Sequence, residues 1–153
     1  SPHPKAVPMK TTLTRLGVAA LGSLLVATGL IVSAPSAEAA SPCPGSRVAR
    51  YQLYAGGEVA DNFRHGQIEV WYSSAKGGTN CVLVYDNVSG KHKMTVEAGI
   101  SGRASAGKDS GTYNYYAGPI KITNTDGKCI SLYAEVINGG ISYRRAMNKI
   151  HCG

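Results

Sequence analysis

The chain has 153 residues and a formal net charge of +7, from 16 Lys and Arg against 9 Asp and Glu. This length excludes two independent cores once a leader is removed, so we expect one domain. The positive charge favours anionic surfaces such as cell-wall polymers, DNA or an acidic partner. The basic residues are scattered, apart from Arg144-Arg145 and the run 91–93. Without a basic stripe that carries interleaved aromatic residues, we do not expect nucleic acid as the partner.

The first segment has the pattern of an export signal. Lys10 and Arg15 form a positive start, residues 16–32 are mostly apolar, and Ala37-Glu38-Ala39 suits a signal peptidase. We predict cleavage after this motif, which divides the chain into upstream residues and signal peptide at 1–39 and a secreted β domain at 40–153. An uncleaved membrane anchor is the alternative, but glycines interrupt the apolar run. No membrane partner is expected after cleavage.

Short β-rich runs separated by glycine-marked turns predict an all-β fold, because no long 3.6-residue periodicity or repeat appears after the leader. We expect a single small antiparallel sandwich or barrel of about seven strands. The predicted strands are Val48–Tyr54, Gln67–Ser73, Asn80–Tyr85, Lys93–Ala98, Asn114–Ile122, Cys129–Ile137 and Gly140–Arg145.

Alternation along these strands assigns their faces. It turns Ile68 and Val70 toward the core and leaves Glu69 and Trp71 on the opposite face. The same rule sends Met94 and Val96 inward, as it does residues 130, 132, 134 and 136. The turn signals Asp126-Gly127 and Asn138-Gly139 predict that the last three strands form a meander. Residues 99–112, rich in glycine and serine, are expected to form a flexible loop.

The four cysteines, Cys43, Cys81, Cys129 and Cys152, all follow the leader. An even number in an exported chain indicates two disulfides, whereas no pair has the two-to-four-residue spacing of a zinc site. If successive strands alternate in direction, Cys43 and Cys81 lie at one end of the sheet and the other two lie at the opposite end. Because a disulfide spans only a few ångströms, we expect Cys43–Cys81 and Cys129–Cys152.

The sequence offers no convincing catalytic group. Asp109-Ser110-Gly111 resembles the nucleophile loop of chymotrypsin-like proteases, but one small domain lacks the two barrels that such enzymes need. The acidic residues Glu58, Asp61, Glu69 and Glu97 could supply a glycosidase pair, yet Glu69 and Glu97 fall on predicted solvent faces. We therefore expect no enzyme activity, no cofactor and no metal.

Aromatic and basic side chains are the candidate binding residues. In the run 113–116, alternation sends Tyr113 and Tyr115 to one face and Tyr116 to the other, so at least one phenol should face water. Together with Trp71 these rings can form a platform for sugars or for a protein contact. Tyrosines that only cover strand surfaces are the simpler explanation. Arg144 and Arg145 would add positive charge.

The order of several short motifs is similar to that of the spore-associated protein A family. These motifs are residues 80–82, the stretch 109–119, residues 127–130 and the ending His151-Cys152-Gly153. The resemblance covers nearly all of the chain after the leader, but it departs after Cys129, where the family tends to carry a tryptophan and glycines. It implies an exported protein of the spore surface or cell wall, and it supplies no catalytic residue.

Two functions are compatible with these observations. The first is a non-enzymatic exported protein that associates with a cell-wall or spore-surface polymer. The second is a secreted, disulfide-stabilised protease inhibitor that presents a rigid loop at residues 99–112 or 58–66.

Overall fold

The computed structural model describes residues 41–56 and 59–153. The predicted signal peptide at 1–39 therefore lies outside the described residues. Within these two stretches every regular element is a strand. No described segment forms a helix with the length and apolarity needed to cross a membrane.

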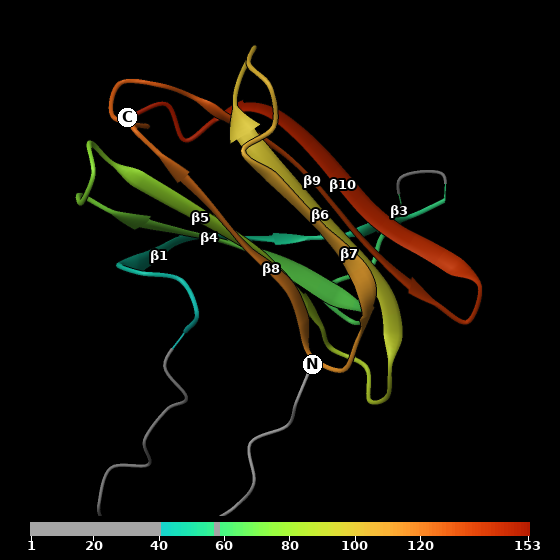
Figure 1. Cartoon of the computed structure of the whole chain (residues 1–153). Helices are drawn as coiled ribbons and strands as arrows, with labels where there is room; N and C mark the ends of the chain where they lie inside the picture. The colour runs from blue at the N-terminus through green and yellow to red at the C-terminus, as the bar shows by residue number, and fades with distance from the viewer. Residues whose placement is uncertain (1–40, 57–58) are drawn as a thin grey trace, which may run out of the picture. The chain divides into compact units, whose positions relative to one another are not determined.

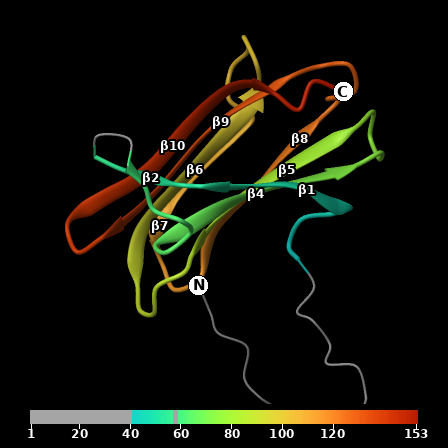
Figure 2. The same ribbon diagram turned by 180° about the vertical axis from the view of Figure 1, so that it is seen from behind.

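Ten strands form two antiparallel sheets that pack as a sandwich, which confirms the predicted fold class. The four-stranded sheet has the order β1-β4-β5-β8, and the six-stranded sheet has the order β3-β2-β10-β9-β6-β7. Figures 1 and 2 show the two layers from opposite sides. The strands are β1 (Ser46–Gln52), β2 (Tyr54–Ala55), β3 (Val59–Ala60), β4 (Gly66–Ser73), β5 (Thr79–Asp86), β6 (His92–Ile100), β7 (Gly107–Tyr113), β8 (Tyr116–Thr123), β9 (Ile130–Asn138) and β10 (Ile141–Ile150).

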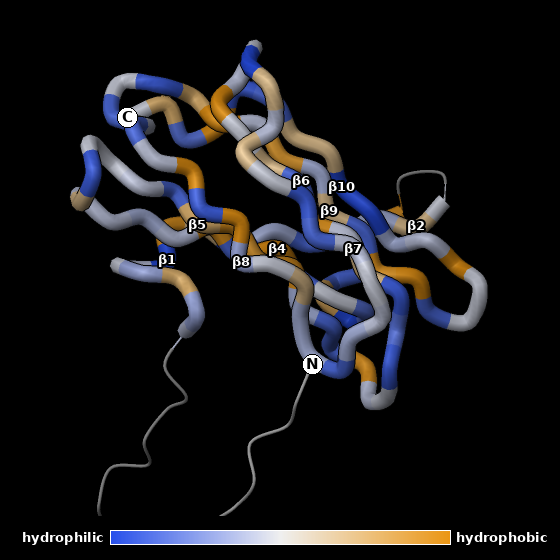
Figure 3. The backbone as a smooth tube through the Cα atoms, in the orientation of Figure 1, coloured by the Kyte–Doolittle hydropathy of each residue, from blue (hydrophilic) through white to orange (hydrophobic). Residues whose placement is uncertain are grey.

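The core lies between the two sheets and contains the residues that alternation turns inward. Ile68 and Val70 of β4 are fully buried, as are Met94 and Val96 of β6. The predicted inward residues of β9 are also buried, with Leu132 the most accessible at 4%. Figure 3 shows hydrophobic stretches on strands of both layers. The period-2 pattern therefore identified the core faces correctly.

The chain passes directly from one sheet to the other at both sides of the sandwich. On one side β1 and β2 belong to different sheets, and the fully buried Leu53 joins them. On the other side a turn joins β7 to β8, which again belong to different sheets. Asp109 of β7 reinforces this corner, because its carboxylate accepts hydrogen bonds from the Gly118 amide at 2.7 Å and the Tyr113 hydroxyl at 2.5 Å. Asp109 therefore stabilises the turn between β7 and β8.

The prediction of a flexible loop at 99–112 is wrong over most of its length. Residues 107–113 form β7, which pairs along β6 from Ala98 to His92. The composition hid this strand, since glycine, aspartate and lysine have low β propensity. At Gly99 a side chain would press against the backbone of the returning segment, with a Cβ at about 3.0 Å from the Ala106 nitrogen. The glycine there permits the close approach of the hairpin.

The predicted meander of the last three strands is correct only in part. Asn138 and Ile141 close a hairpin between β9 and β10, whose two loop glycines have φ of 57° and 77°. The Asp126-Gly127 turn, by contrast, connects β8 to β9 across the two sheets. A short turn can join two strands without pairing them, and the local sequence does not distinguish these cases.

Both predicted disulfides are confirmed. Cys43 is bonded to Cys81 with a Cα–Cα distance of 5.7 Å, and Cys129 to Cys152 with a distance of 4.0 Å. The predicted cysteine pairs are correct although the strands do not form the single continuous meander from which we inferred them. Two disulfides fit an oxidising, extracellular environment.

Candidate functional site

A pocket of about 670 Å³ lies where β2 meets β10. We call it the arginine pocket. It is lined by Tyr54, Ala55 and Gly56 from the β2 segment, Tyr133 from β9, and residues 144–147 of β10. The strand β2 pairs with β10 through Arg144 and Tyr54 alone. Because β2 is so short, the side chains around this pairing are left accessible.

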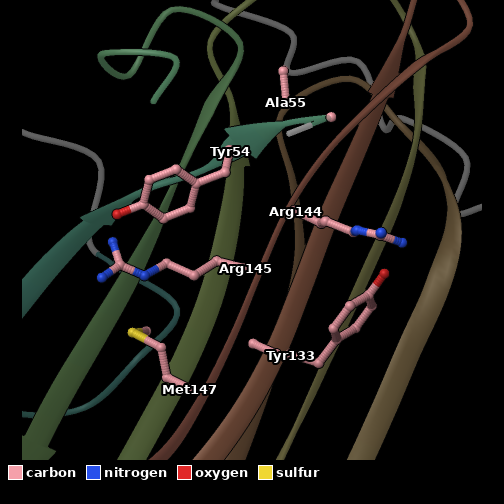
Figure 4. Close-up of a pocket in the computed structure, with 8 residues that line it drawn as sticks. Tyr54, Ala55, Tyr133, Arg144, Arg145 and Met147 are labelled. Atoms are coloured by element: carbon pink, nitrogen blue, oxygen red, sulfur yellow. The ribbon is translucent and has the colours of Figure 1, made fainter. Parts of the chain in front are cut away.

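The two arginines enter the arginine pocket from opposite sides of β10. Successive residues of a strand point to opposite faces, so Arg144 and Arg145 diverge. Figure 4 shows Arg145 beside Tyr54 on one side of the strand and Arg144 near Tyr133 on the other. The pocket therefore presents two cationic groups around one strand.

Aromatic rings hold the guanidinium of Arg145. Its central carbon lies 5.0 Å from the ring centroids of both Tyr51 and Tyr54, which is within cation–π range. Its Nη1 donates a hydrogen bond to the Gln52 carbonyl at 3.3 Å. Arg145 is half-buried, whereas Arg144 is exposed. One guanidinium is thus fixed in place and the other extends into solvent.

The electrostatics of the pocket favour an anion. Within the described part of the chain, no carboxylate lies within 4.0 Å of either guanidinium. On the other side of the pocket, burial and the neighbouring Glu135 raise the pKa of Tyr133, with Arg144 opposing this shift. The Tyr133 phenol therefore stays protonated, and its neighbouring acceptor is Glu135, which is also the cross-strand partner of Arg144. Each guanidinium group can bind a phosphate or carboxylate group, one on either side of β10.

Trp71 occupies a different surface. It lies on the outer face of the four-stranded sheet, where it packs with Leu83, Tyr85 and the Cys43–Cys81 disulfide. Its indole Nε1 donates a hydrogen bond to Glu69 at 3.0 Å. The ring is therefore half-buried and already engaged by its neighbours, which limits its use as an open platform.

The environment of Glu69 differs from the one that we predicted. We predicted a solvated side chain, but Glu69 is only 4% exposed. Its carboxylate accepts hydrogen bonds from Arg47 at 2.7 Å, Gln67 at 2.9 Å and Trp71. Gln67 and Trp71 lie two residues before and after Glu69, so alternation places their donors on its face. That local pattern is the signal that our sequence analysis missed.

The three candidate tyrosines do not form one face. The chain turns at Asn114 and Tyr115, so β8 begins at Tyr116 and the predicted strand from Asn114 starts two residues too early. Tyr113 donates its hydroxyl proton to Asp109, and this hydrogen bond raises the pKa of the Tyr113 phenol. Tyr116 packs against Tyr85 with ring centroids 5.6 Å apart. Tyr115 is 74% exposed, which confirms that at least one phenol faces water.

The structure thus separates the predicted binding residues into three places. Trp71 belongs to the outer face of the four-stranded sheet, the tyrosines to the β7–β8 corner, and the arginines to β10. The sequence analysis missed Tyr54 and Tyr133 as partners of the arginines. Alternation places Tyr133 on the same outer face as Arg144, whose direct cross-strand partner is Glu135. The approach of Tyr54 depends on the long-range pairing of β2.

The three histidines in the described residues all contact other side chains. His65 stacks on the Tyr143 ring at 3.8 Å, and His92 Nδ1 lies 2.5 Å from the Asp86 carboxylate. His151 Nε2 lies 3.0 Å from the Tyr51 hydroxyl. Burial lowers the pKa of His151. The structure describes no cluster of three or more His, Cys, Asp and Glu side chains arranged to hold a metal.

The fold and site define a small disulfide-bonded β-sandwich with an arginine- and tyrosine-lined surface pocket. Comparisons with protein-family models, curated proteins and solved structures found no match to this chain.

Proposed function

We propose that the protein is an exported, non-enzymatic protein that associates with the cell wall or spore surface by binding an anionic polymer in the arginine pocket. The observation that carries this proposal is the pair Arg144 and Arg145, which present two cations in one pocket with no described carboxylate within 4.0 Å. A polymer with repeated phosphate or carboxylate groups can engage both sides of β10. The two disulfides and the family resemblance agree with an extracellular location.

Several side chains that could have served catalysis perform structural tasks. Asp109 joins β7 to β8, and Glu69 is covered by three hydrogen-bond donors. His92 is held by Asp86. These contacts support a binding function over an enzymatic one.

Binding of the secreted protein to purified cell walls and spores tests the proposal. We expect retention that weakens as salt is raised from 0.05 to about 1 M, since screening shortens the reach of surface charges from about 14 Å to 3 Å. A hydrogen bond to a charged group contributes about 1.5 kcal/mol or more, so Arg144→Ala should weaken binding about tenfold.

The double variant Arg144→Ala/Arg145→Ala should abolish salt-sensitive retention. The matched control is Arg64→Ala/Arg103→Ala, which removes the same charge from two exposed arginines outside the arginine pocket. Equal retention of the two double variants would refute the arginine pocket as the binding site. Recovery of the wild-type protein entirely in the medium would refute surface association itself.

The alternative proposal is a secreted protease inhibitor. Because β7 takes up residues 107–113, the connection available for presentation shortens to 101–106. That connection is braced by its own hydrogen bonds, including Ala106 N to the Ala98 carbonyl at 2.9 Å. A rigid, protruding hairpin end that carries the exposed Arg103 is compatible with inhibition of a protease whose specificity pocket is acidic.

A further inference from the structure

A second pocket, of about 420 Å³, lies at the corner where β7 turns into β8. We call it the tyrosine-turn pocket. It is formed by Asp86, the last residue of β5, by the following residues 87–90, and by Asn114 and Tyr115 of the β7–β8 turn. Its volume falls within the range of about 300–1,000 Å³ that is typical of small-ligand sites. It belongs to different elements from the arginine pocket.

The accessible chemistry of the tyrosine-turn pocket is polar and neutral. Asn87, Ser89 and Asn114 are all exposed and offer amide and hydroxyl groups. Its one charged lining residue among those described is Asp86, whose side chain is fully buried. One Asp86 oxygen lies 2.5 Å from His92 Nδ1, and the other accepts the Val88 amide at 2.9 Å. The carboxylate therefore shapes the loop and is not offered to a ligand.

The Tyr115 ring supplies an open aromatic surface next to these polar groups. It is 74% exposed, more than the other large hydrophobic side chains that the structure describes. Tyr116, the next residue, packs against Tyr85 and anchors the turn to the four-stranded sheet. An exposed aromatic ring beside neutral amides matches a saccharide, whose apolar C–H face stacks on the ring while its hydroxyl groups hydrogen-bond to the amides.

One backbone and one side-chain hydrogen bond already fix the two walls of the pocket. The Asp86 amide donates to the Tyr115 carbonyl at 2.8 Å, which ties the loop directly to the turn. On the other side, Asn87 Nδ2 donates to the Phe63 carbonyl at 2.7 Å. A ligand would therefore find most of the site in place and would lose little free energy in ordering it.

We propose that the tyrosine-turn pocket binds a neutral saccharide, with Tyr115 as the stacking surface and Asn87 and Asn114 as hydrogen-bonding groups. This site goes beyond the proposed function, because it needs no charge and lies on different strands from the arginines. The two sites together would let one small domain bind a polymer through both its sugar units and its anionic groups.

The test is a titration of the isotope-labelled secreted protein with neutral tetrasaccharides, namely those of glucose (β-1,4 and α-1,4 linked) and of N-acetylglucosamine, followed by NMR. We expect at least one to shift the amide signals of Asn87 and Asn114, with a Kd in the micromolar to millimolar range that does not depend on salt. Tyr115→Ala should weaken this binding at least tenfold. Tyr115→Phe should retain it, because the ring is kept.

Two controls separate the outcomes. Arg144→Ala/Arg145→Ala should leave the saccharide shifts unchanged, so failure of the arginine pocket and failure of the tyrosine-turn pocket are distinguishable. Ile141→Ala, which truncates another exposed apolar side chain at 49% exposure, should also bind normally. The proposal is overturned if no tetrasaccharide shifts these amides at about 10 mM, which corresponds to binding weaker than about 3 kcal/mol. It is equally overturned if Tyr115→Ala binds the tetrasaccharide like the wild type.

Discussion

Replacing Glu69 tests whether the hydrogen bonds on the outer face of the four-stranded sheet stabilise the fold in addition to the core between the sheets. The variant Glu69→Ala removes the acceptor of the Trp71 indole and of the Gln67 amide. A buried donor without a partner costs about 1–3 kcal/mol, so the half-buried donors of Trp71 and Gln67 each cost about 1 kcal/mol, near the lower end of that range. Arg47 is 48% exposed, so solvent screening limits the loss of its ion pair to about 1 kcal/mol. We therefore expect Glu69→Ala to lower the free energy of unfolding by about 2–4 kcal/mol.

Glu97 provides the matched control. It is also a strand glutamate on an outer face, but its side chain is 39% exposed and lies 3.9 Å from Lys108. Such a pair contributes less than about 1 kcal/mol, so Glu97→Ala should have little effect. Glu69→Gln, which keeps the size and one acceptor oxygen, should fall between the two variants.

Urea unfolding with the disulfides intact measures these differences. Trp71 is the single tryptophan of the chain, and its indole touches the altered carboxylate, so its fluorescence reports on this face directly. Circular dichroism of the strands gives an independent transition for comparison. If Glu69→Ala and Glu97→Ala destabilise the protein equally, the three-donor cluster contributes nothing beyond an ordinary surface charge and the reasoning fails.

Two further predictions concern stability. The double variant Cys129→Ser/Cys152→Ser removes the disulfide that closes a loop between cysteines 23 residues apart. The chain-entropy model then gives a decrease of about 3.5 kcal/mol in the free energy of unfolding, measurable as a lower urea midpoint. An unchanged midpoint would contradict this prediction. Burial lowers the pKa of His151 below its ordinary 6.5 in the folded protein. The unfolded chain therefore binds a proton first as pH falls, so the stability that His151 contributes is complete above pH 6.5 and decreases as pH drops through its folded pKa. Urea midpoints between pH 7.5 and 5 should fall more steeply for the wild type than for His151→Gln, and parallel slopes would exclude this role for His151.

Local sequence patterns predicted the strands that combine β-branched residues with strict alternation. The burial of Ile68 and Val70 follows from period 2 alone, whichever strands lie beside β4. β7 could not be found in this way, because its sequence, Gly107 to Tyr113, has little β propensity of its own. It is a strand because β6 offers an edge along which every residue of β7 pairs. That stabilisation comes from residues outside the strand itself.

In the candidate site, too, some features follow from the local sequence and others depend on long-range packing. The pair Arg144 and Arg145 stood out in the sequence, and alternation determines that they diverge. Tyr54 joins Arg145 only because Leu53 carries the chain from one sheet to the other, a crossing that has no local signature. The exposure of Tyr115 likewise depends on a turn placed within a run of tyrosines that reads as a continuous strand.

The N-terminal disulfide determines where binding can occur on this sandwich. By joining Cys43 to Cys81 it holds the segment before β1 against the outer face of β5, where Leu83 becomes fully buried. The central strand β5 is therefore covered on both faces, as its unbroken burial from Thr79 to Val84 shows. The covered centre of this sheet cannot offer a flat face to a ligand, and within its strands exposed residues occur only on the edge strands β1 and β8. The arginine pocket, beside the two-residue strand β2, and the tyrosine-turn pocket, at the β7–β8 corner, lie in the places that this packing leaves open.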